Sequence, residues 1–318
     1  MIQSLKKIIK AELIFYTIIA IICLLTSCKK EKASKDLALN TTKKLVVNND
    51  LKPKELSQEF KNYWYAGEAE ISSYKLEQAR YGEIRNGKAV LIYVTEDFLP
   101  DIQVKADRQN KNNISVLKLN ATKNFNTGIY PYSIMHSTFY PVSNDRHAIK
   151  ISNSMQEWCG HVYAQLNNKK QFEVMSHSYF EGEADNSFRL DKTVLENELW
   201  AQLRIAPKSL PTGELKIIPS FEYSRLRHVP IKAYKATAIM KEGIYSITYP
   251  ELNRTLSIAF NPNFPYDILG WEETFKSGFG TGAKVLKTKA TKLKTIKSAY
   301  WGKNSNKDEI LRDTLQLK

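Results

Sequence analysis

The chain has 318 residues, of which 42% are hydrophobic, 25% charged and 11% aromatic. This is the composition of a globular protein, and it excludes collagen-like, coiled-coil and wholly disordered chains. The formal net charge is +14, but residues 55–283 contain 26 basic and 26 acidic residues, so the positive excess lies at the two ends. Residues 28–54 carry a net charge of +5, and residues 284–318 carry +7.

A nucleic-acid-binding protein is expected to carry its basic residues on the folded domain, interleaved with aromatic side chains that stack on bases. The observed charge distribution therefore argues against nucleic acid as a partner. Lysines near the ends of a chain suit contact with an anionic membrane surface, to which each nearby lysine contributes about 1 kcal/mol. The alternative is that both ends are solvated, Lys-rich tails.

The first 28 residues have the pattern of an export signal. Three lysines within residues 6–10 precede the apolar run Leu13–Leu25, which is too short to span a bilayer and suits the hydrophobic region of a signal peptide. The run ends in Leu25-Thr26-Ser27-Cys28, which resembles the bacterial lipobox. We therefore predict a lipoprotein signal peptide over residues 1–27 and lipidation of Cys28, whose two or three acyl chains would anchor the protein stably. A cleaved signal with an incidental cysteine, or an uncleaved anchor, is the alternative.

Residues 28–54 are predicted to form a flexible, Lys-rich tether. In lipoproteins, an aspartate directly after the lipidated cysteine commonly retains the protein at the inner membrane, and an acidic cluster nearby favours the cell surface. Here Lys29 follows the cysteine and Glu31 is the nearest acidic residue. The resemblance therefore implies a lipid anchor at the periplasmic face of the outer membrane. The remaining thiol, Cys159, is expected to be a small buried apolar residue.

The mature chain begins with a predicted helix over Glu55–Trp64, after which alternating β-branched and aromatic residues predict strands. The first hairpin is expected to join Gly67–Tyr81 to Lys88–Phe98 through Asn86-Gly87, a dipeptide that favours a type I′ turn. Further strands are predicted at Ile114–Ala121, Tyr130–Val142, Ala148–Gln165 and Phe172–Ala184.

The second half begins with Asp191–Leu203, where leucines recur every four residues and predict an amphipathic helix. Ser305 and Asp308 form a capping-box-like start to a last helix that ends near Leu315. Between the two helices, strands are predicted at Glu214–Arg225, Lys232–Met240, Tyr245–Tyr249, Thr255–Phe260, Tyr266–Phe275 and from Ala283 to about Ile296.

Long strands with short turns and few helices predict a mainly β fold, either a large twisted antiparallel sheet or an incomplete barrel with a few short α-helices. We expect residues 55–318 to form one β-rich domain, with a possible sub-boundary near residues 206–213.

Three segments carry a family resemblance: residues 65–70 (Tyr-Ala-Gly-Glu-Ala-Glu), 156–161 (Gln-Glu-Trp-Cys-Gly-His) and 176–184 (Ser-His-Ser-Tyr-Phe-Glu-Gly-Glu-Ala). They resemble a family of Bacteroidota outer-membrane lipoproteins of unknown function. Its members are often labelled septum formation inhibitor, after a cytoplasmic nucleotide pyrophosphatase whose Ser-x-Ser-Pro-Arg-Arg motif does not occur in this sequence. The strand-rich pattern is also similar to the half-barrels of periplasmic lipid carriers, a likeness of fold only.

Candidate catalytic chemistry rests on Glu157, His161 and His177, which lie on neighbouring predicted strands. If those strands pair, the three side chains could converge into a general acid/base or metal cluster. The alternative is a polar network that is satisfied within the sheet. The common motifs of hydrolases, zinc proteases and EF-hands do not occur in the sequence.

Two further sets of residues are candidates for binding. Glu181, Glu183 and Asp185 alternate, so on a strand their carboxylates would share one face and could hold a hard cation; a solvated acidic face is the alternative. Arg225 and Arg227, beside Tyr223, could bind an anion such as a phosphate head group, or pair with acidic residues across the sheet.

The sequence thus favours a membrane-anchored, non-enzymatic envelope lipoprotein that binds an apolar or amphiphilic ligand, or an envelope protein partner. No cofactor is expected. The alternative function is an envelope hydrolase, or a metal-dependent enzyme, that uses the His/Glu cluster.

Overall fold

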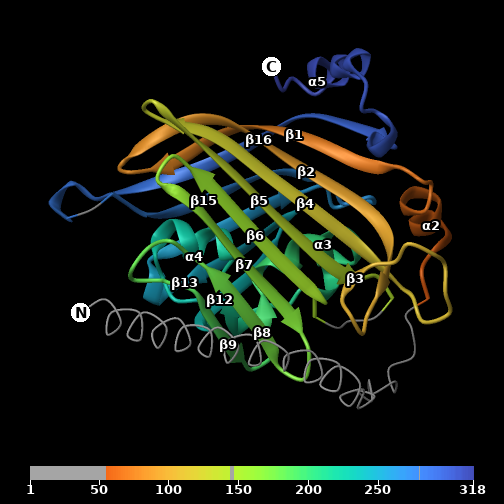
Figure 1. The fold of residues 1–318 in the computed structure, drawn as a ribbon, viewed down its shortest axis with the longest axis horizontal. Helices are drawn as coiled ribbons and strands as arrows, with labels where there is room; N and C mark the ends of the chain where they lie inside the picture. The colour runs from red at the N-terminus through yellow and green to blue at the C-terminus, as the bar shows by residue number, and fades with distance from the viewer. Residues whose placement is uncertain (1–54, 144–146, 279) are drawn as a thin grey trace, which may run out of the picture. The chain divides into compact units, whose positions relative to one another are not determined.

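The computed structural model describes residues 55–143, 147–278 and 280–318. The predicted signal peptide, Cys28 and the tether over residues 28–54 lie outside them. In the described part of the chain, sixteen strands form one large, twisted and unclosed sheet, accompanied by a few short helices (Figure 1). The predicted fold class is confirmed, with one addition: β10 and β11 pair in parallel, whereas the other paired strands are antiparallel.

The strands are β1 (Ala69–Arg80), β2 (Glu83–Leu99), β3 (Val104–Lys105), β4 (Ile114–Thr127), β5 (Tyr130–Pro141), β6 (Lys150–Glu157), β7 (Gly160–Asn168), β8 (Phe172–His177), β9 (Asn186–Leu190), β10 (Val194–Leu195), β11 (Gly213–Ile218), β12 (Tyr234–Lys241), β13 (Ile244–Tyr249), β14 (Arg254–Phe260), β15 (Ile268–Ser277) and β16 (Lys284–Ser298). The helices are α2 (Gln58–Trp64), α3 (Glu196–Ile205), α4 (Phe221–Arg227) and α5 (Ile310–Thr314).

The first and last strands of the chain, β1 and β16, are neighbours in the middle of the sheet. From β1 the chain moves strand by strand to the edge at β9, crosses to the opposite edge at β10, and returns through α3 and β11 to β16, which pairs with β1. The sheet therefore has two arms joined at β1 and β16. The possible sub-boundary near residues 206–213 corresponds to the connection from α3 to Gly213, the first residue of β11, and strands of the same sheet lie on both sides of it.

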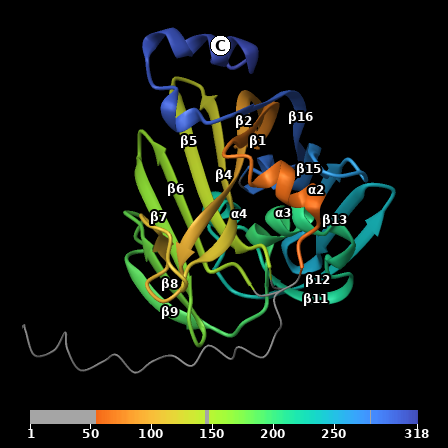
Figure 2. The ribbon, with the colours of Figure 1, turned by 90° about the vertical axis from the view of Figure 1, so that its right-hand side faces the viewer.

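Helices α3 and α4 lie between the two arms of the sheet (Figures 1 and 2). Leu199 and Leu203 of α3 belong to the largest core cluster, together with Tyr93 of β2, Leu119 of β4 and Tyr249 of β13. Because residues of both arms and of the helix pack in the same cluster, the inner face of the sheet is largely filled by protein.

Helix α3 also carries buried charges that bind it to both arms. Arg204 donates to both carboxylate oxygens of Glu70 on β1, at 2.6 and 2.7 Å, and both side chains are about 1% exposed. At the other end of the helix, Glu196 accepts hydrogen bonds from Arg254 of β14 and from Tyr249. These pairs fix the position of α3 across the sheet.

Several local predictions are wrong, and in each case a neighbouring element explains the difference. The first hairpin turns at Tyr81-Gly82, both with positive φ, whereas Asn86-Gly87 lies inside β2. An added Cβ at Gly87 would lie 2.3 Å from the carbonyl oxygen of Asn124, so this glycine allows β4 to approach closely. The segment Ala148–Gln165 is not one strand but includes the β6–β7 hairpin, and Cys159 is exposed at its turn rather than buried.

The predicted strand Glu214–Arg225 ends at Ile218, and α4 begins at Phe221 after Ser220, whose hydroxyl accepts from the backbone amide of Tyr223. The predicted strand Phe172–Ala184 likewise ends at His177. Residues 284–298 are not a solvated tail, since they form β16 in the middle of the sheet. In the described residues, no helix is both long and apolar enough to cross a membrane.

Candidate functional site

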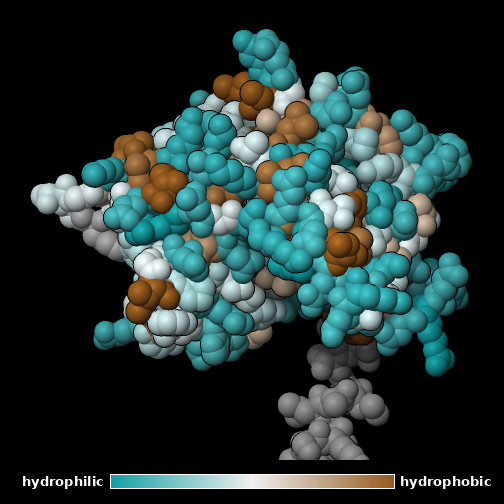
Figure 3. All heavy atoms as spheres, turned by 90° about the horizontal axis from the view of Figure 1, so that it is seen from above, coloured by the Kyte–Doolittle hydropathy of each residue, from teal (hydrophilic) through white to brown (hydrophobic). Residues whose placement is uncertain are grey.

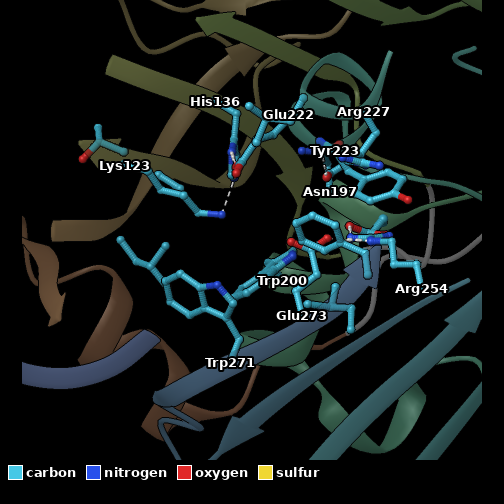
Figure 4. Close-up of a pocket in the computed structure, with 18 residues that line it drawn as sticks. Lys123, His136, Asn197, Trp200, Glu222, Tyr223, Arg227, Arg254, Trp271 and Glu273 are labelled. Atoms are coloured by element: carbon cyan, nitrogen blue, oxygen red, sulfur yellow. Dashed lines mark hydrogen bonds and ion pairs between the residues drawn. The ribbon is translucent and has the colours of Figure 1, made fainter. Parts of the chain in front are cut away.

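A cavity lies between α3, α4 and the inner side of the sheet (Figure 4). It offers about 40 Å³ to the centres of water-sized molecules, which is room for roughly three waters. Its walls come from both arms and both helices: Leu91, Ala121, Thr122, Lys123, His136, Glu196, Asn197, Trp200, Ser220, Glu222, Tyr223, Leu226, Arg227, Arg254, Leu256, Trp271, Glu273 and Phe275.

The apolar part of the wall is built around two tryptophans. Trp200 projects from α3 and Trp271 from β15, and their rings meet edge to face with centroids 5.3 Å apart. Leucines from β2, α4 and β14 complete this side. An apolar group that enters the cavity would therefore contact aromatic and aliphatic surfaces together.

One polar group of the wall joins β4, β5 and α4. The ammonium of Lys123 donates to Glu222 at 2.7 Å, and Nδ1 of His136 lies 3.9 Å from the same carboxylate (Figure 4). Burial and the nearby charge of Lys123 lower the pKa of His136 from 6.5 to about 3, although Glu196 acts in the opposite direction. The imidazole is therefore neutral at physiological pH.

The other polar group surrounds Arg254. Its guanidinium pairs with Glu196 and, through Nε at 2.6 Å, with Glu273, and it lies 4.1 Å from the ring centre of Tyr223. Burial alone would raise the pKa of Glu196, but the charge and hydrogen bonds of Arg254 outweigh it and lower that pKa. Burial raises the pKa of Tyr223 to about 12. These groups satisfy one another and leave little capacity for a ligand.

Two lining residues keep unused donor capacity. Asn197 is 2% exposed, and its Oδ1 accepts from the amide of Phe221 at 3.3 Å, while its Nδ2 has no hydrogen-bond partner. Arg227 lies over the ring of Phe275, and no carboxylate of the described residues is within ion-pair distance of it. A buried donor without a partner costs about 1–3 kcal/mol, so the cavity is suited to a group that accepts hydrogen bonds.

Of the three predicted anion-binding residues, the structure places Tyr223 and Arg227 at this cavity. Arg225 lies elsewhere. Its guanidinium is 3.4 Å from Glu183 and 4.1 Å from the ring centre of Phe180. The reason is that α4 is a helix and not the predicted strand, so residues two positions apart point in different directions.

The predicted metal-binding acids do not line one strand face. Glu181, Glu183 and Asp185 lie in the connection between β8 and β9. Glu183 accepts from Ser178 and is 2.7 Å from His228, whereas Asp185 is 3.4 Å from His177. Across the described residues, no group of three or more His, Cys, Asp or Glu side chains is placed to hold a metal ion.

The structure does not bring Glu157, His161 and His177 together. Gln156 is opposite His161 in the β6–β7 pair, so Glu157 points to the other side of the sheet, where it accepts from the amide of Cys159 at 2.7 Å. His177 is opposite Tyr163 rather than His161, and it pairs with Asp185. The geometry gives no support to a catalytic centre built from these three residues.

Sequence reasoning missed Lys123, His136, Asn197 and Arg254. For Asn197 a signal is present in the run Glu196-Asn197-Glu198 of α3, directly before Leu199, whereas the sequence around Lys123, His136 and Arg254 carries none. Three consecutive residues cannot all face solvent on a helix that is packed on both sides, so some of these polar groups had to be buried with partners.

Comparison with protein-family models and with curated proteins finds no match. Among solved structures, the chain is similar to a β-barrel-like protein of the domain of unknown function DUF1849 from Brucella abortus. The two share 8% sequence identity with a TM-score of 0.36, and the match covers 72% of this chain and 97% of the other.

Proposed function

We propose that the protein is a non-enzymatic envelope lipoprotein, anchored through Cys28 at the periplasmic face of the outer membrane, whose β-rich part binds a small amphiphilic ligand. The anchor is supported by the lipobox-like sequence that ends at Cys28. The ligand-binding part rests on one observation: a cavity with aromatic walls contains the unpartnered Nδ2 of Asn197 and the carboxylate-free guanidinium of Arg227.

The chemistry of these groups defines the ligand. The amide of Asn197 and the guanidinium of Arg227 are donors, so they select a carboxylate, a phosphate or a carbonyl oxygen. Trp200 and Trp271 provide the surface for an adjoining apolar group. The two contributions together favour an amphiphile with an anionic head over a purely apolar molecule.

The size of the cavity limits the length of the ligand. Pockets that enclose a whole drug-sized molecule measure about 300–1,000 Å³. Here α3 and α4 occupy the inner face of the sheet, so the cavity holds only a few atoms. We therefore propose a short amphiphile, or the head of a longer one whose tail remains outside, rather than a carrier that encloses a complete acyl chain.

The test is calorimetric titration of the mature chain carrying Cys28→Ser, in detergent-free buffer, with octanoate and with the uncharged octanol as probes. Octanoate should bind, and Arg227→Gln should weaken it by about tenfold or more, because a hydrogen bond to a charged group contributes about 1.5–3 kcal/mol. Octanol binding should be unchanged by this substitution.

The matched control is Arg225→Gln, which removes the same group from the same helix but outside the cavity. It should leave octanoate binding unchanged. Equal losses in the two variants would show that α4 matters only for folding. Absence of binding of either probe to the wild-type cavity would instead favour a protein partner in the envelope.

A further inference from the structure

The lysines of the C-terminal region are arranged on a folded surface. Strand β16 pairs with β15 on one side and with β1 on the other. Along β16, Thr288 and Ala290 are buried, whereas Lys287 and Lys289 are exposed, so the lysines point away from the core. We propose that this outer face of β15, β16, β1 and β2 docks onto an anionic lipid surface.

We define the outer lysine face by six residues on these four strands. They are Lys75, Lys88, Lys276, Lys287, Lys289 and Lys294. Seen from above, the surface is mostly hydrophilic, with separate hydrophobic patches (Figure 3). The proposal rests on the membrane anchoring proposed above and adds which face of the protein meets the membrane.

The strand register brings two like charges together on this face. Lys75 on β1 is directly opposite Lys88 on β2, a half-buried residue whose ammonium also donates to the carbonyl oxygen of Gln316 at 2.7 Å. Lys289 on β16, by contrast, is opposite Glu77 on β1 and Glu272 on β15. Two like charges that are directly opposite across antiparallel strands destabilise the pair. A bound layer of anions would remove this repulsion, which is the behaviour expected of a surface that functions in contact with negative charge.

Acidic residues compensate only part of this charge. Glu272 is 2.6 Å from Lys287, and Glu77 is 3.6 Å from Lys75. In the described part of the chain, Lys276, Lys289 and Lys294 have no carboxylate within ion-pair distance. The six lysines that define the outer lysine face and these two glutamates together carry a net charge of +4.

A lipid surface fits this face better than a nucleic acid does. The outward positions beside Lys276, Lys287, Lys289 and Lys294 include Thr274, Thr291, Ser73 and Val285, none of which is an aromatic side chain that could stack on bases. Further along the same side, Ile71, Val90, Ile92 and Ile296 pack with Tyr300, Leu315 and Leu317 of the C-terminal segment. Lysines on a broad sheet face suit the diffuse negative potential of a membrane, which acts on each nearby lysine separately. The 27 residues 28–54 could span up to about 90 Å if fully extended, so an anchored chain could reach the membrane with this face.

The experiment measures cosedimentation of the mature chain carrying Cys28→Ser with vesicles of phosphatidylcholine alone, or with phosphatidylglycerol added. The face variant replaces Lys75, Lys289 and Lys294 by Gln. The control variant replaces Lys208, Lys235 and Lys241, which are exposed elsewhere on the protein, by Gln. Both variants lose three charges and keep the Lys-rich tether, so only the position of the charges differs.

The Cys28→Ser chain with all its lysines should bind the vesicles that contain phosphatidylglycerol, and it should dissociate from them in high salt. The face variant should bind roughly tenfold to hundredfold more weakly, whereas the control variant should lose much less. Thermal unfolding of both variants verifies that they are folded. Equal loss of vesicle binding in the two variants would overturn the proposal, because binding would then depend on net charge and not on the position of the lysines. Equal binding of the unsubstituted chain to both kinds of vesicle would also overturn it.

Unchanged vesicle binding by the face variant would also overturn the proposal, because the Lys-rich tether would then be the part that binds the vesicles. The mass of the N-terminal peptide of the wild-type protein reports acylation of Cys28 separately. A protein that is acylated but fails the vesicle comparison would refute the docking face alone, and an unmodified Cys28 would refute the anchor alone.

Discussion

His136 is a buried imidazole whose surroundings disfavour the charged form. It lies beside the Lys123 ammonium and close to Glu222, with Glu196 further along the cavity wall. In the folded chain its pKa is about 3, whereas in the unfolded chain it returns to about 6.5. Between these values the unfolded chain binds more protons, so the contribution of His136 to stability is complete above pH 6.5 and decreases as the pH falls.

This difference in pKa predicts that the free energy of unfolding decreases as the pH falls, and that His136→Gln removes this dependence. From pH 6.5 to pH 5 the wild-type protein should lose roughly 2 kcal/mol of unfolding free energy through this residue, at about 1.4 kcal/mol per pH unit. Urea unfolding at pH 7.5 and pH 5 measures the loss in the wild type and in the variant. His161→Gln, at an exposed position, is the control and should retain the wild-type dependence. Parallel curves for wild type and His136→Gln would contradict the assignment.

At the scale of elements, α3 is the part that holds the two arms of the sheet together. Its buried leucines pack in the core, and its two ends pair with Glu70 of one arm and Arg254 of the other. Burial alone would raise the pKa of Glu70, but Arg204 outweighs it and lowers that pKa. Such a pair adds little compared with apolar residues, yet the loss of one partner leaves a charge buried without compensation.

We therefore expect Arg204→Met to destabilise the protein by about 3–5 kcal/mol, because the Glu70 carboxylate would remain in the core without its partner. Combining it with Glu70→Leu should recover part of this loss. The comparison is Arg189→Met, which breaks an exposed pair with Glu173 and should cost less than about 1 kcal/mol. Chemical denaturation measures the wild type, the three single variants Arg204→Met, Glu70→Leu and Arg189→Met, and the double variant. A double variant that is as unstable as the sum of the single changes would contradict a paired role.

At the scale of the whole molecule, the topology places distant parts of the chain in one sheet. The first and last long strands, β1 and β16, are neighbours, and the two edges are formed by β9 and β10 from the middle of the chain. The basic C-terminal region thus lies beside the beginning of the domain. The proposed lipid anchor precedes this domain in the sequence. In our proposals, the anchor and the outer lysine face contact the same membrane.

The proposed anchor gives a prediction for the chain expressed with its N-terminal segment. Cys28→Ser should yield either unprocessed precursor or a chain without acyl groups, because neither Cys23 nor Cys159 follows a lipobox. The tether is polar, so it can supply only salt-sensitive attraction, and this protein should leave membranes in high salt. Mass spectrometry of the N-terminal peptide and membrane fractionation provide the measurements. Retention of the variant on membranes in high salt would contradict the role of the acyl chains.

The sequence by itself determined the class of fold and the approximate positions of most strands and helices. This is possible because alternation in strands, periodicity in helices, and caps such as Ser305 with Asp308 are local patterns. Local patterns failed where a neighbour decided the outcome. Gly87 is a glycine because the β4 backbone approaches it, and not because a turn lies there. Similarly, α4 replaces a predicted strand because Phe221 and Leu226 are buried between the arms.

Only the tertiary structure decided where the candidate site lies. Lys123 and Glu222 are 99 positions apart, and Asn197 and Arg227 line the same cavity only because α3 and α4 both lie between the two arms. Spacing in the sequence carries no record of such contacts, since they depend on the curvature of the sheet and on which arm each strand joins. The lysines of β16 were visible in the sequence, but their common outward direction follows from the pairing of β16 with β1 and β15.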